Sequence, residues 1–223
     1  MAESATTTTK SLIRRALPSP VVSVIQVLRR LAPDSRLGFV RVWLRRLFTR
    51  SGPLPAGLPR APKVLFVCHG NILRSAMAQA LYADRVRAGL APTESTAESA
   101  GTAARDGDPA DPRGVSAAKE MGIVLDGHRA GRLSEELINR ADLIVVMDFL
   151  NEADVVARFP AAAGKVRLLG SFLGKNGRPA EIRDPYSGSQ DDVRASFQTI
   201  ASAIDALAAT LSLAGTREAG NSA

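Results

Sequence analysis

A C-x5-R pattern followed by a hydroxyl marks the stretch of this chain best suited to chemistry. It reads Cys68-His69-Gly70-Asn71-Ile72-Leu73-Arg74-Ser75. Gly70 and Asn71 tolerate left-handed backbone, so successive N–H groups can turn inward around an oxyanion. Arg74 offers parallel donors to two phosphate oxygens, and such a positive site favours the thiolate form of a cysteine. We therefore predict that Cys68 attacks a bound phosphate group and that Ser75 donates a hydrogen bond to its sulfur.

A second interpretation of Cys68 is an inert core residue, because cysteines that end buried strands are common. The joint arrangement of a strand, a Gly-Asn turn and an Arg-Ser helix start favours the nucleophile. A Walker-type phosphate loop is excluded, since no G-x-x-x-x-G-K-[ST] occurs.

Attack on a phosphate ester releases an alkoxide or phenolate, which needs a proton from a general acid. Asp184, in the turn Asp184-Pro185-Tyr186, is the favoured carboxylate because Pro185 stiffens a loop that precedes the last helix. The competing carboxylates are Asp106, Asp108 and Asp111.

These residues need a scaffold, and alternating apolar strands and helices supply one. Strands are predicted at 64–68, 95–99, 141–147 and 166–169, and helices at 75–90, 113–121, 134–139, 151–158 and 191–213. Ser134 is predicted to cap its helix. The pattern predicts an α/β fold, with a small parallel β-sheet flanked by helices on both faces. Ligands of such sheets bind at the carboxyl ends of the strands, where the loop at 68–75 lies.

Charge divides the 223-residue chain into two parts. Residues 1–60 contain eleven basic and two acidic residues, a formal charge of +9, whereas the rest contains 18 basic and 20 acidic residues, a charge of −2. The domains predicted are a basic amphipathic helical extension (1–50), a Pro/Gly-rich linker (51–62), a catalytic domain (63–213) and a disordered tail (214–223). A lone cysteine excludes a disulfide-built fold, and the apolar runs are too short for a membrane span.

The basic extension carries two amphipathic patterns. Their apolar positions are Val21, Val24, Ile25, Leu28 and Leu31, then Val40, Trp43, Leu44, Leu47 and Phe48. Cationic helices of this kind suit an anionic membrane surface. Packing on the domain or in a dimer, an organelle transit peptide and an upstream start-codon artefact are the alternatives. No motif indicates nucleic-acid binding. We expect a cytoplasmic protein that contacts the inner membrane surface through residues 1–50.

From about Lys63 to Leu213 the chain resembles the low-molecular-weight protein tyrosine phosphatases. Seven motifs in the family's order carry the resemblance: the loop at 68–75, Ser99-Ala100-Gly101-Thr102, Asp111-Pro112-Arg113, Gly127-His128-Arg129, residues 141–148, residues 164–172 and Asp184-Pro185-Tyr186. The resemblance implies the family's fold and a protein-tyrosine-phosphatase that hydrolyses phosphotyrosine in proteins through a phosphocysteine. It implies no cofactor and no metal.

Residue by residue, the resemblance implies Cys68 as nucleophile, Arg74 as phosphate binder and transition-state clamp, and Asp184 as acid and then base. It also implies contacts to the substrate or its phosphate from His69, Gly70, Asn71, Ile72, Leu73, Ser75 and Tyr186. The Asn71 side chain would brace the loop together with Ser99 and His128.

The chain departs from the family at several positions. Leu73 stands where a second cysteine is common, Ala76 replaces a usual proline, and Ser187 replaces a common tyrosine. The loop at 103–109 lacks the aromatic residue that often walls the cleft. Two alternatives stay open: an arsenate reductase coupled to an external thiol or glutaredoxin, and a non-catalytic phosphate-binding module.

Overall fold

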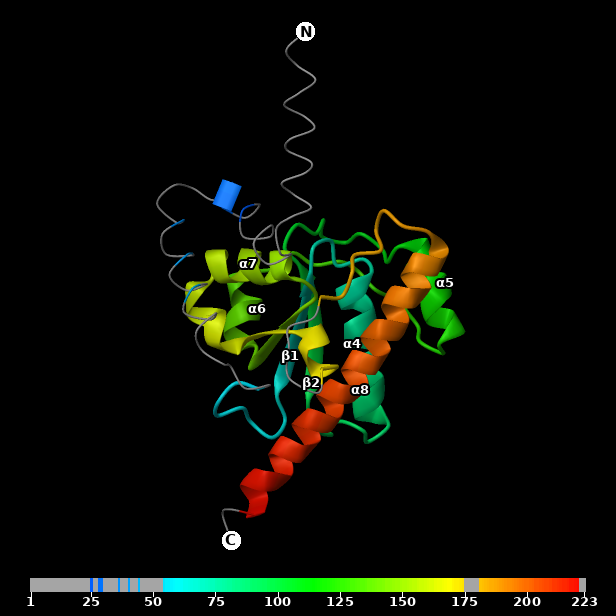
Figure 1. The fold of residues 1–223 in the computed structure, drawn as a ribbon. Helices are drawn as coiled ribbons and strands as arrows, with labels where there is room; N and C mark the ends of the chain where they lie inside the picture. Colours follow the sequence, from blue (N-terminus) through cyan, green and yellow to red (C-terminus); the bar gives the residue numbers. More distant parts are fainter. Residues whose placement is uncertain are drawn as a thin grey trace.

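A computed structural model describes residues 54–174 and 181–220, together with Ile25, Leu28, Arg29, Arg36, Val40 and Leu44. Its centre is a parallel sheet in the order β2-β1-β3-β4 (Figure 1). The strands are β1 (Lys63–Cys68), β2 (Thr96–Gly101), β3 (Leu143–Val146) and β4 (Val166–Leu168). The predicted α/β fold class is confirmed.

Strand β1 is buried on both faces, as its continuous apolar sequence predicts. Phe66 packs into a core cluster on one face, and Leu65 and Val67 pack into a second cluster on the other. Val67 pairs with β2 on one side and with β3 on the other, so β1 is a central strand. Cys68 is the last residue of this strand and pairs with Gly101 of β2, so its position at the end of the sheet is fixed.

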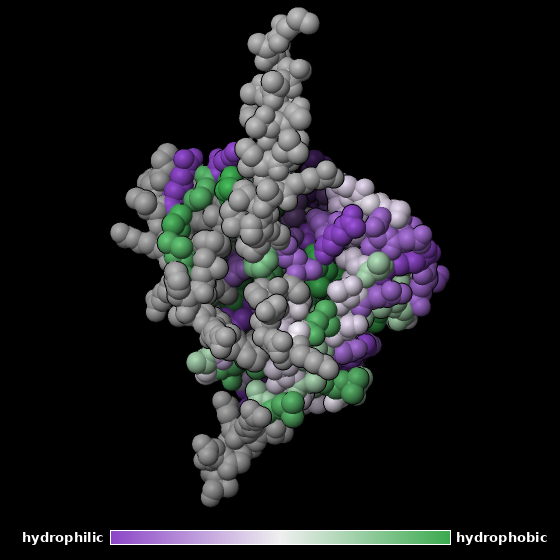
Figure 2. Space-filling model, in the orientation of Figure 1, coloured by the Kyte–Doolittle hydropathy of each residue, from purple (hydrophilic) through white to green (hydrophobic). Residues whose placement is uncertain are grey.

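Helices cover both faces of the sheet (Figure 1). One face carries α4 (Arg74–Arg87), α5 (Pro112–Glu120) and α8 (Gln190–Gly220), and the other carries α6 (Glu135–Arg140) and α7 (Phe149–Arg158). Two 3-10 helices, η1 (Pro160–Lys165) and η2 (Leu169–Phe172), flank β4. Figure 2 shows a mostly hydrophilic surface on the side where Figure 1 places α5.

Side-chain caps fix three helix starts. Asp111 accepts a hydrogen bond from Arg113 N at α5, Asp148 accepts one from Asn151 N at α7, and Ser134 accepts one from Leu137 N at α6. The cap predicted at Ser134 is confirmed. The two aspartates also contact the loop at 68–75: Asp111 N donates to the Ile72 carbonyl, and Asp148 accepts from Arg74.

Helix α8 is longer than predicted. Its apolar periodicity ends at Leu211, so the sequence indicated an end at Leu213, but the helix continues to Gly220 through residues predicted as a disordered tail. No proline follows to stop it. By length and composition alone, residues 190–215 of this helix could cross a bilayer. Uninterrupted apolar runs in the sequence did not predict this candidate, because polar residues divide it. In this fold the apolar face of α8 packs against α4, α5 and η2.

Part of the basic extension touches the domain. Leu28 and Val40 are partly buried against the core cluster on the α6–α7 face, whereas Arg29, Arg36 and Leu44 are exposed. This is the contact expected if the extension packs on the domain. The other residues of the predicted extension lie outside the described part of the chain. Residues 54–62 contain no helix or strand, and Leu54 and Leu58 pack against the core cluster on the α4–α8 face.

Candidate active site

Cys68 ends β1, and its buried sulfur faces the loop that follows. The Ser75 hydroxyl lies 3.0 Å from Cys68 Sγ, and the Asn71 backbone N–H donates to the same sulfur at 3.3 Å. The predicted contact between Ser75 and the sulfur is thus present. These two contacts hold the sulfur in one position beside the loop.

Asn71 holds the loop in shape. It is the only non-glycine residue with a positive φ (+55°) in the part of the chain that the structure describes. Its Nδ2 donates to the hydroxyls of Ser75 and Ser99, both at 2.9 Å, and its Oδ1 accepts from Gly131 N at 2.8 Å. The left-handed turn predicted for Gly70-Asn71 is therefore made at Asn71, and its side chain ties the loop to β2 and to residue 131.

His128 braces the loop differently from the expectation. Its Nε2 lies 2.6 Å from the backbone carbonyl of Asn71, not from the Asn71 side chain. The side-chain amide is already engaged by Ser75, Ser99 and Gly131, which leaves the carbonyl as the acceptor. Burial lowers the pKa of His128 below its usual 6.5, although its bond to Asn71 opposes the shift. The neutral ring with hydrogen on Nε2 is the form that donates here.

Arg74 is buried, with a side chain only 2% exposed, and its guanidinium lies between two carboxylates. Nη1 donates to Asp148 Oδ2 at 2.6 Å and to the Ile182 carbonyl at 3.1 Å, and Nη2 donates to Asp184 Oδ2 at 2.7 Å. Burial alone would lower the pKa of Arg74, but attraction by Cys68, Asp148 and Asp184 raises it instead. The arginine is a permanent cation held in one orientation.

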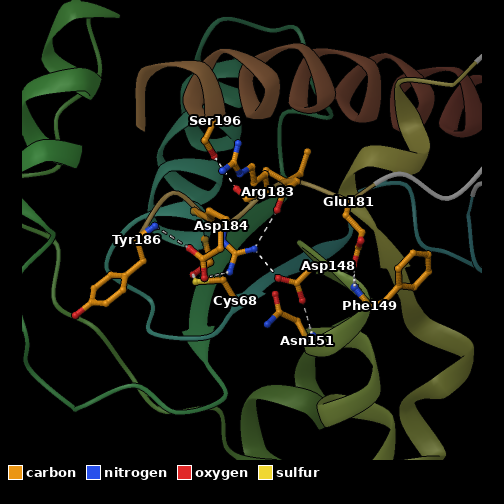
Figure 3. A network of polar contacts seen from close by, with 12 residues as sticks. Cys68, Asp148, Phe149, Asn151, Glu181, Arg183, Asp184, Tyr186 and Ser196 are labelled. Carbon is orange, nitrogen blue, oxygen red and sulfur yellow. Dashed lines mark hydrogen bonds and ion pairs between the residues drawn. The ribbon is translucent and has the colours of Figure 1, made fainter. Parts of the chain in front are cut away.

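Asp184 reaches the sulfur's surroundings from a separate loop. Asp184 and Cys68 line the same cleft, and the carboxylates of Asp184 and Asp148 both accept hydrogen bonds from Arg74, drawn as dashed lines in Figure 3. The Asp184 Oδ1 accepts from Tyr186 N at 3.2 Å, which makes a local turn around Pro185. The Tyr186 ring points away from Cys68 (Figure 3), and the residue is 60% exposed although it lines the cleft.

A cleft of about 390 Å³ opens above the loop. It is lined by Cys68, His69, Gly70, Asn71, Ile72, Leu73, Arg74, Ala103, Arg105, Asp108, Asp184 and Tyr186. Of the competing carboxylates, Asp108 shares the cleft, Asp106 accepts from Arg132 N and Asp111 is bound to Arg113. Unlike these three carboxylates, Asp184 forms an ion pair with Arg74. Among the described residues, no group of His, Cys, Asp and Glu is placed to hold a metal ion.

Two residues of the site were not singled out from the sequence. Asp148, the ion-pair partner of Arg74, belongs to a stretch noted only for its family resemblance. A usable signal existed, because a carboxylate directly after a buried strand lies at the carboxyl edge of a parallel sheet. Arg113 had no such signal, since it binds the Asp184 loop through the backbone carbonyls of residues 186 and 188.

Comparisons with known proteins agree with this geometry. A relative from Ralstonia nicotianae, named "Probable low molecular weight protein-tyrosine-phosphatase EpsP", is 39% identical over 64% of this chain and 91% of its own length. The solved YwlE arginine phosphatase of Geobacillus stearothermophilus matches with a TM-score of 0.64 at 32% identity, covering 70% of this chain and 96% of that one. The tyrosine phosphatase Wzb of Escherichia coli K30, solved with sulphate, gives a TM-score of 0.60 at 29% identity over 68% and 99%.

The sequence profile of one family spans the whole catalytic domain. It is described as low molecular weight phosphotyrosine protein phosphatase, and it matches residues 63–216. This range includes the loop at 68–75, the bracing residues and Asp184. The chain therefore belongs to the low molecular weight phosphotyrosine protein phosphatase family.

Proposed function

We propose that this enzyme hydrolyses phosphotyrosine in proteins through a phosphocysteine on Cys68. The observation that carries the proposal is one nucleophilic sulfur in a preorganised loop, beside a buried arginine and a carboxylate from a different loop. The two carboxylates hold Arg74 at the edge of the cleft, where its guanidinium can stabilise charge on a transferring phosphoryl group.

The reaction has two steps. The Cys68 thiolate attacks phosphorus, the bond from phosphorus to the tyrosine oxygen breaks, and protonated Asp184 gives its proton to the leaving phenolate. Water then attacks the phosphocysteine while the Asp184 carboxylate takes its proton, which releases inorganic phosphate and restores the thiolate. Backbone N–H groups of residues 69–74 hold the phosphoryl oxygens in both steps.

Hydrolysis of a phosphotyrosine peptide by Cys68→Ser and Asp184→Ala variants tests the proposal. We expect Cys68→Ser to lose all turnover and Asp184→Ala to lose about 10²-fold or more, with exposed Asp126→Ala as a matched control. Activity that survives Cys68→Ser would refute the mechanism. A phosphoarginine peptide belongs in the same assay, because one similar structure is an arginine phosphatase. Thiol-dependent arsenate reduction without phosphatase activity would establish the arsenate reductase instead.

We further propose that the basic extension brings the enzyme to an anionic membrane surface on the cytoplasmic side. The charge of +9 over residues 1–60 and the exposure of Arg29, Arg36 and Leu44 support this role. Co-sedimentation of the full chain with anionic and with neutral vesicles tests it. Equal binding to both kinds of vesicle would remove the electrostatic basis of the proposal.

A further inference from the structure

Arg113, near the start of α5, takes no part in the chemistry described above, yet it joins three parts of the site. Its Nη1 donates to the Gly188 carbonyl at 2.8 Å, and its Nη2 donates to the Tyr186 carbonyl at 3.1 Å. Its Nε and Nη2 also bind both oxygens of Asp111, at 3.0 and 2.7 Å. One planar guanidinium thus holds two carbonyls of the Asp184 loop and one carboxylate of its own helix cap.

Asp111 carries the connection onward to the phosphate loop. Its backbone N–H donates to the Ile72 carbonyl at 3.0 Å, and its side chain caps α5 through Arg113 N at 2.9 Å. The hydrogen bond from Arg113 and the burial of Asp111 act oppositely on the Asp111 carboxyl, and the net effect lowers its pKa. Asp111 is therefore anionic at neutral pH, and its pair with Arg113 persists.

The loop that carries Asp184 depends on Arg113 on one side only. Before Asp184, Ile182 N binds the Met147 carbonyl and Arg74 binds the Ile182 carbonyl. After Asp184, both hydrogen bonds that join residues 185–188 to another described element are donated by Arg113. The Gln190 side chain closes the arrangement by donating to the Arg113 carbonyl at 3.1 Å.

We propose that Arg113 is a positioning residue that sets the distance between the Asp184 carboxyl and the leaving-group oxygen. The proposal rests on the proposed function, in which Asp184 protonates that oxygen. Proton transfer needs the two heavy atoms within about 2.6–3.2 Å, and a displacement of about 1 Å can cost 10²-fold. Arg113 joins the acid loop to Asp111, and Asp111 N donates to the Ile72 carbonyl of the phosphate loop. The Asp184 carboxyl and the phosphate loop are therefore both positioned relative to Asp111.

Leaving-group dependence separates positioning from simple stabilisation. We would measure kcat/KM, which includes phosphocysteine formation, for phenyl phosphate and for 2,4-dinitrophenyl phosphate. The first leaving group needs a proton, and the second departs without one. For Arg113→Ala we expect kcat/KM for phenyl phosphate to fall at least about tenfold more than for the dinitrophenyl ester. Arg113→Lys keeps the charge but lacks the planar fork, and should recover part of that ratio.

Arg194→Ala is the matched control. Arg194 of α8 joins that helix to α5 through Glu120 and pairs with Asp191 of its own helix, but it makes no described contact with the acid loop. It should leave the ratio of the two substrates unchanged, even if both arginine variants lower the melting temperature. In the double variant Arg113→Ala/Asp184→Asn, the effect of Arg113 on the ratio should vanish, because no acid remains to be positioned.

Three outcomes would overturn the inference: equal losses for both substrates, no loss in Arg113→Ala, or an undiminished Arg113 effect in the Asp184→Asn background. The first would assign Arg113 a purely structural role. Inactivity of the wild-type enzyme toward every aryl phosphate would instead overturn the proposed function, and with it the reason for an acid. The soluble, folded state of each variant is checked by its unfolding transition, and Arg113→Lys provides the test if Arg113→Ala does not fold.

Discussion

Arg74 has several anionic partners for one positive charge, and substrate must compete with them. Asp148 is bound through Nη1, so that side of the guanidinium is held by the α7 cap. Asp184 is bound through Nη2, and its side chain is 46% exposed, so it can leave more easily. A phosphate group that uses Nη2 therefore replaces Asp184, which is then free to act on the leaving group.

This competition predicts opposite effects of Asp184→Asn on binding and turnover. The variant removes a negative charge beside Arg74 and the incoming phosphate, so inhibition by inorganic phosphate or vanadate should strengthen by about threefold to tenfold. Turnover of phenyl phosphate should fall, because the amide donates no proton. Inhibition constants and kcat/KM from the same preparation test this, with Asp126→Asn as the control. Weaker anion binding in Asp184→Asn would contradict the competition.

At the scale of single residues, the sequence predicted contacts that are local and missed those that are not. The link of Cys68 to Ser75 follows from a compact loop at a strand end, whereas the link of Asn71 to Ser99, 28 positions away on β2, was expected only from the family resemblance. The partner of Arg74, Asp148, lies 74 positions away and is brought near by the pairing of β1 with β3. His128 bonds the backbone carbonyl of Asn71 because other groups already occupy the Asn71 side-chain amide, which the sequence does not show.

At the scale of elements, the end of β2 presses directly against the phosphate loop. A Cβ added at Gly101 would lie 2.6 Å from the His69 carbonyl oxygen and 3.0 Å from Asn71 N. Both are backbone atoms, which yield less easily than the tip of a side chain. Only glycine lets β2 and the loop approach this closely.

Gly101→Ala should therefore lower both stability and activity. We expect about 1–3 kcal/mol of destabilisation from overpacking, with a lower kcat/KM because the loop that holds the phosphate is displaced. Gly164→Ala, in η1, is the control, since nothing lies within 4 Å of its added Cβ. Urea unfolding and aryl phosphate hydrolysis measure the two effects. Full activity in Gly101→Ala would show that β2 does not set the loop's shape.

The segment that follows α5 braces the loop through His128 and Gly131, and its contribution should depend on pH. The pKa of His128 is lowered by burial, so the unfolded chain takes up the proton before the folded one does. Stability from His128 is thus complete above about pH 6.5 and is lost as pH falls toward the lower folded pKa.

Thermal melting between pH 7 and 5 tests this dependence. The melting temperature of His128→Gln should decline less steeply with acidification than that of the wild type, because glutamine does not titrate. His69→Gln is the matched control, as the chain has two histidines and the His69 side chain is exposed. Parallel slopes for wild type and His128→Gln would show that another group causes the acid sensitivity.

Most elements were predictable because their signals are local. The four strands and five helices follow from apolar runs and periodicity, and their bounds shifted by only a few residues except at the end of α8. The order of the strands determines the site more directly than their bounds do, because it brings the ends of β1, β2 and β3 together. The parallel pairing was expected, whereas the contacts of Arg113 with the acid loop depend on the distance between α5 and α8.

At the scale of the whole molecule, two surfaces compete for the apolar residues of the basic extension. Leu28 and Val40 are partly buried against the core cluster on the α6–α7 face. A membrane surface would engage the same kind of residue, together with the positive charges of residues 1–60. Removing these residues leaves a catalytic domain of formal charge −2.

A chain of residues 61–223 separates the two roles. It retains every residue of the cleft, so kcat/KM for phenyl phosphate should stay within about twofold of the full chain. Loss of the core contacts of Leu28, Val40, Leu54 and Leu58 should lower the free energy of unfolding by about 1–2 kcal/mol. Vesicle binding should disappear, and in the full chain it should weaken steeply as salt rises, because each basic residue near an anionic surface contributes about 1 kcal/mol that salt screens. Salt-independent vesicle binding that persists in residues 61–223 would place the membrane contact on the catalytic domain. An unchanged free energy of unfolding would show that packing of residues 1–60 does not stabilise that domain.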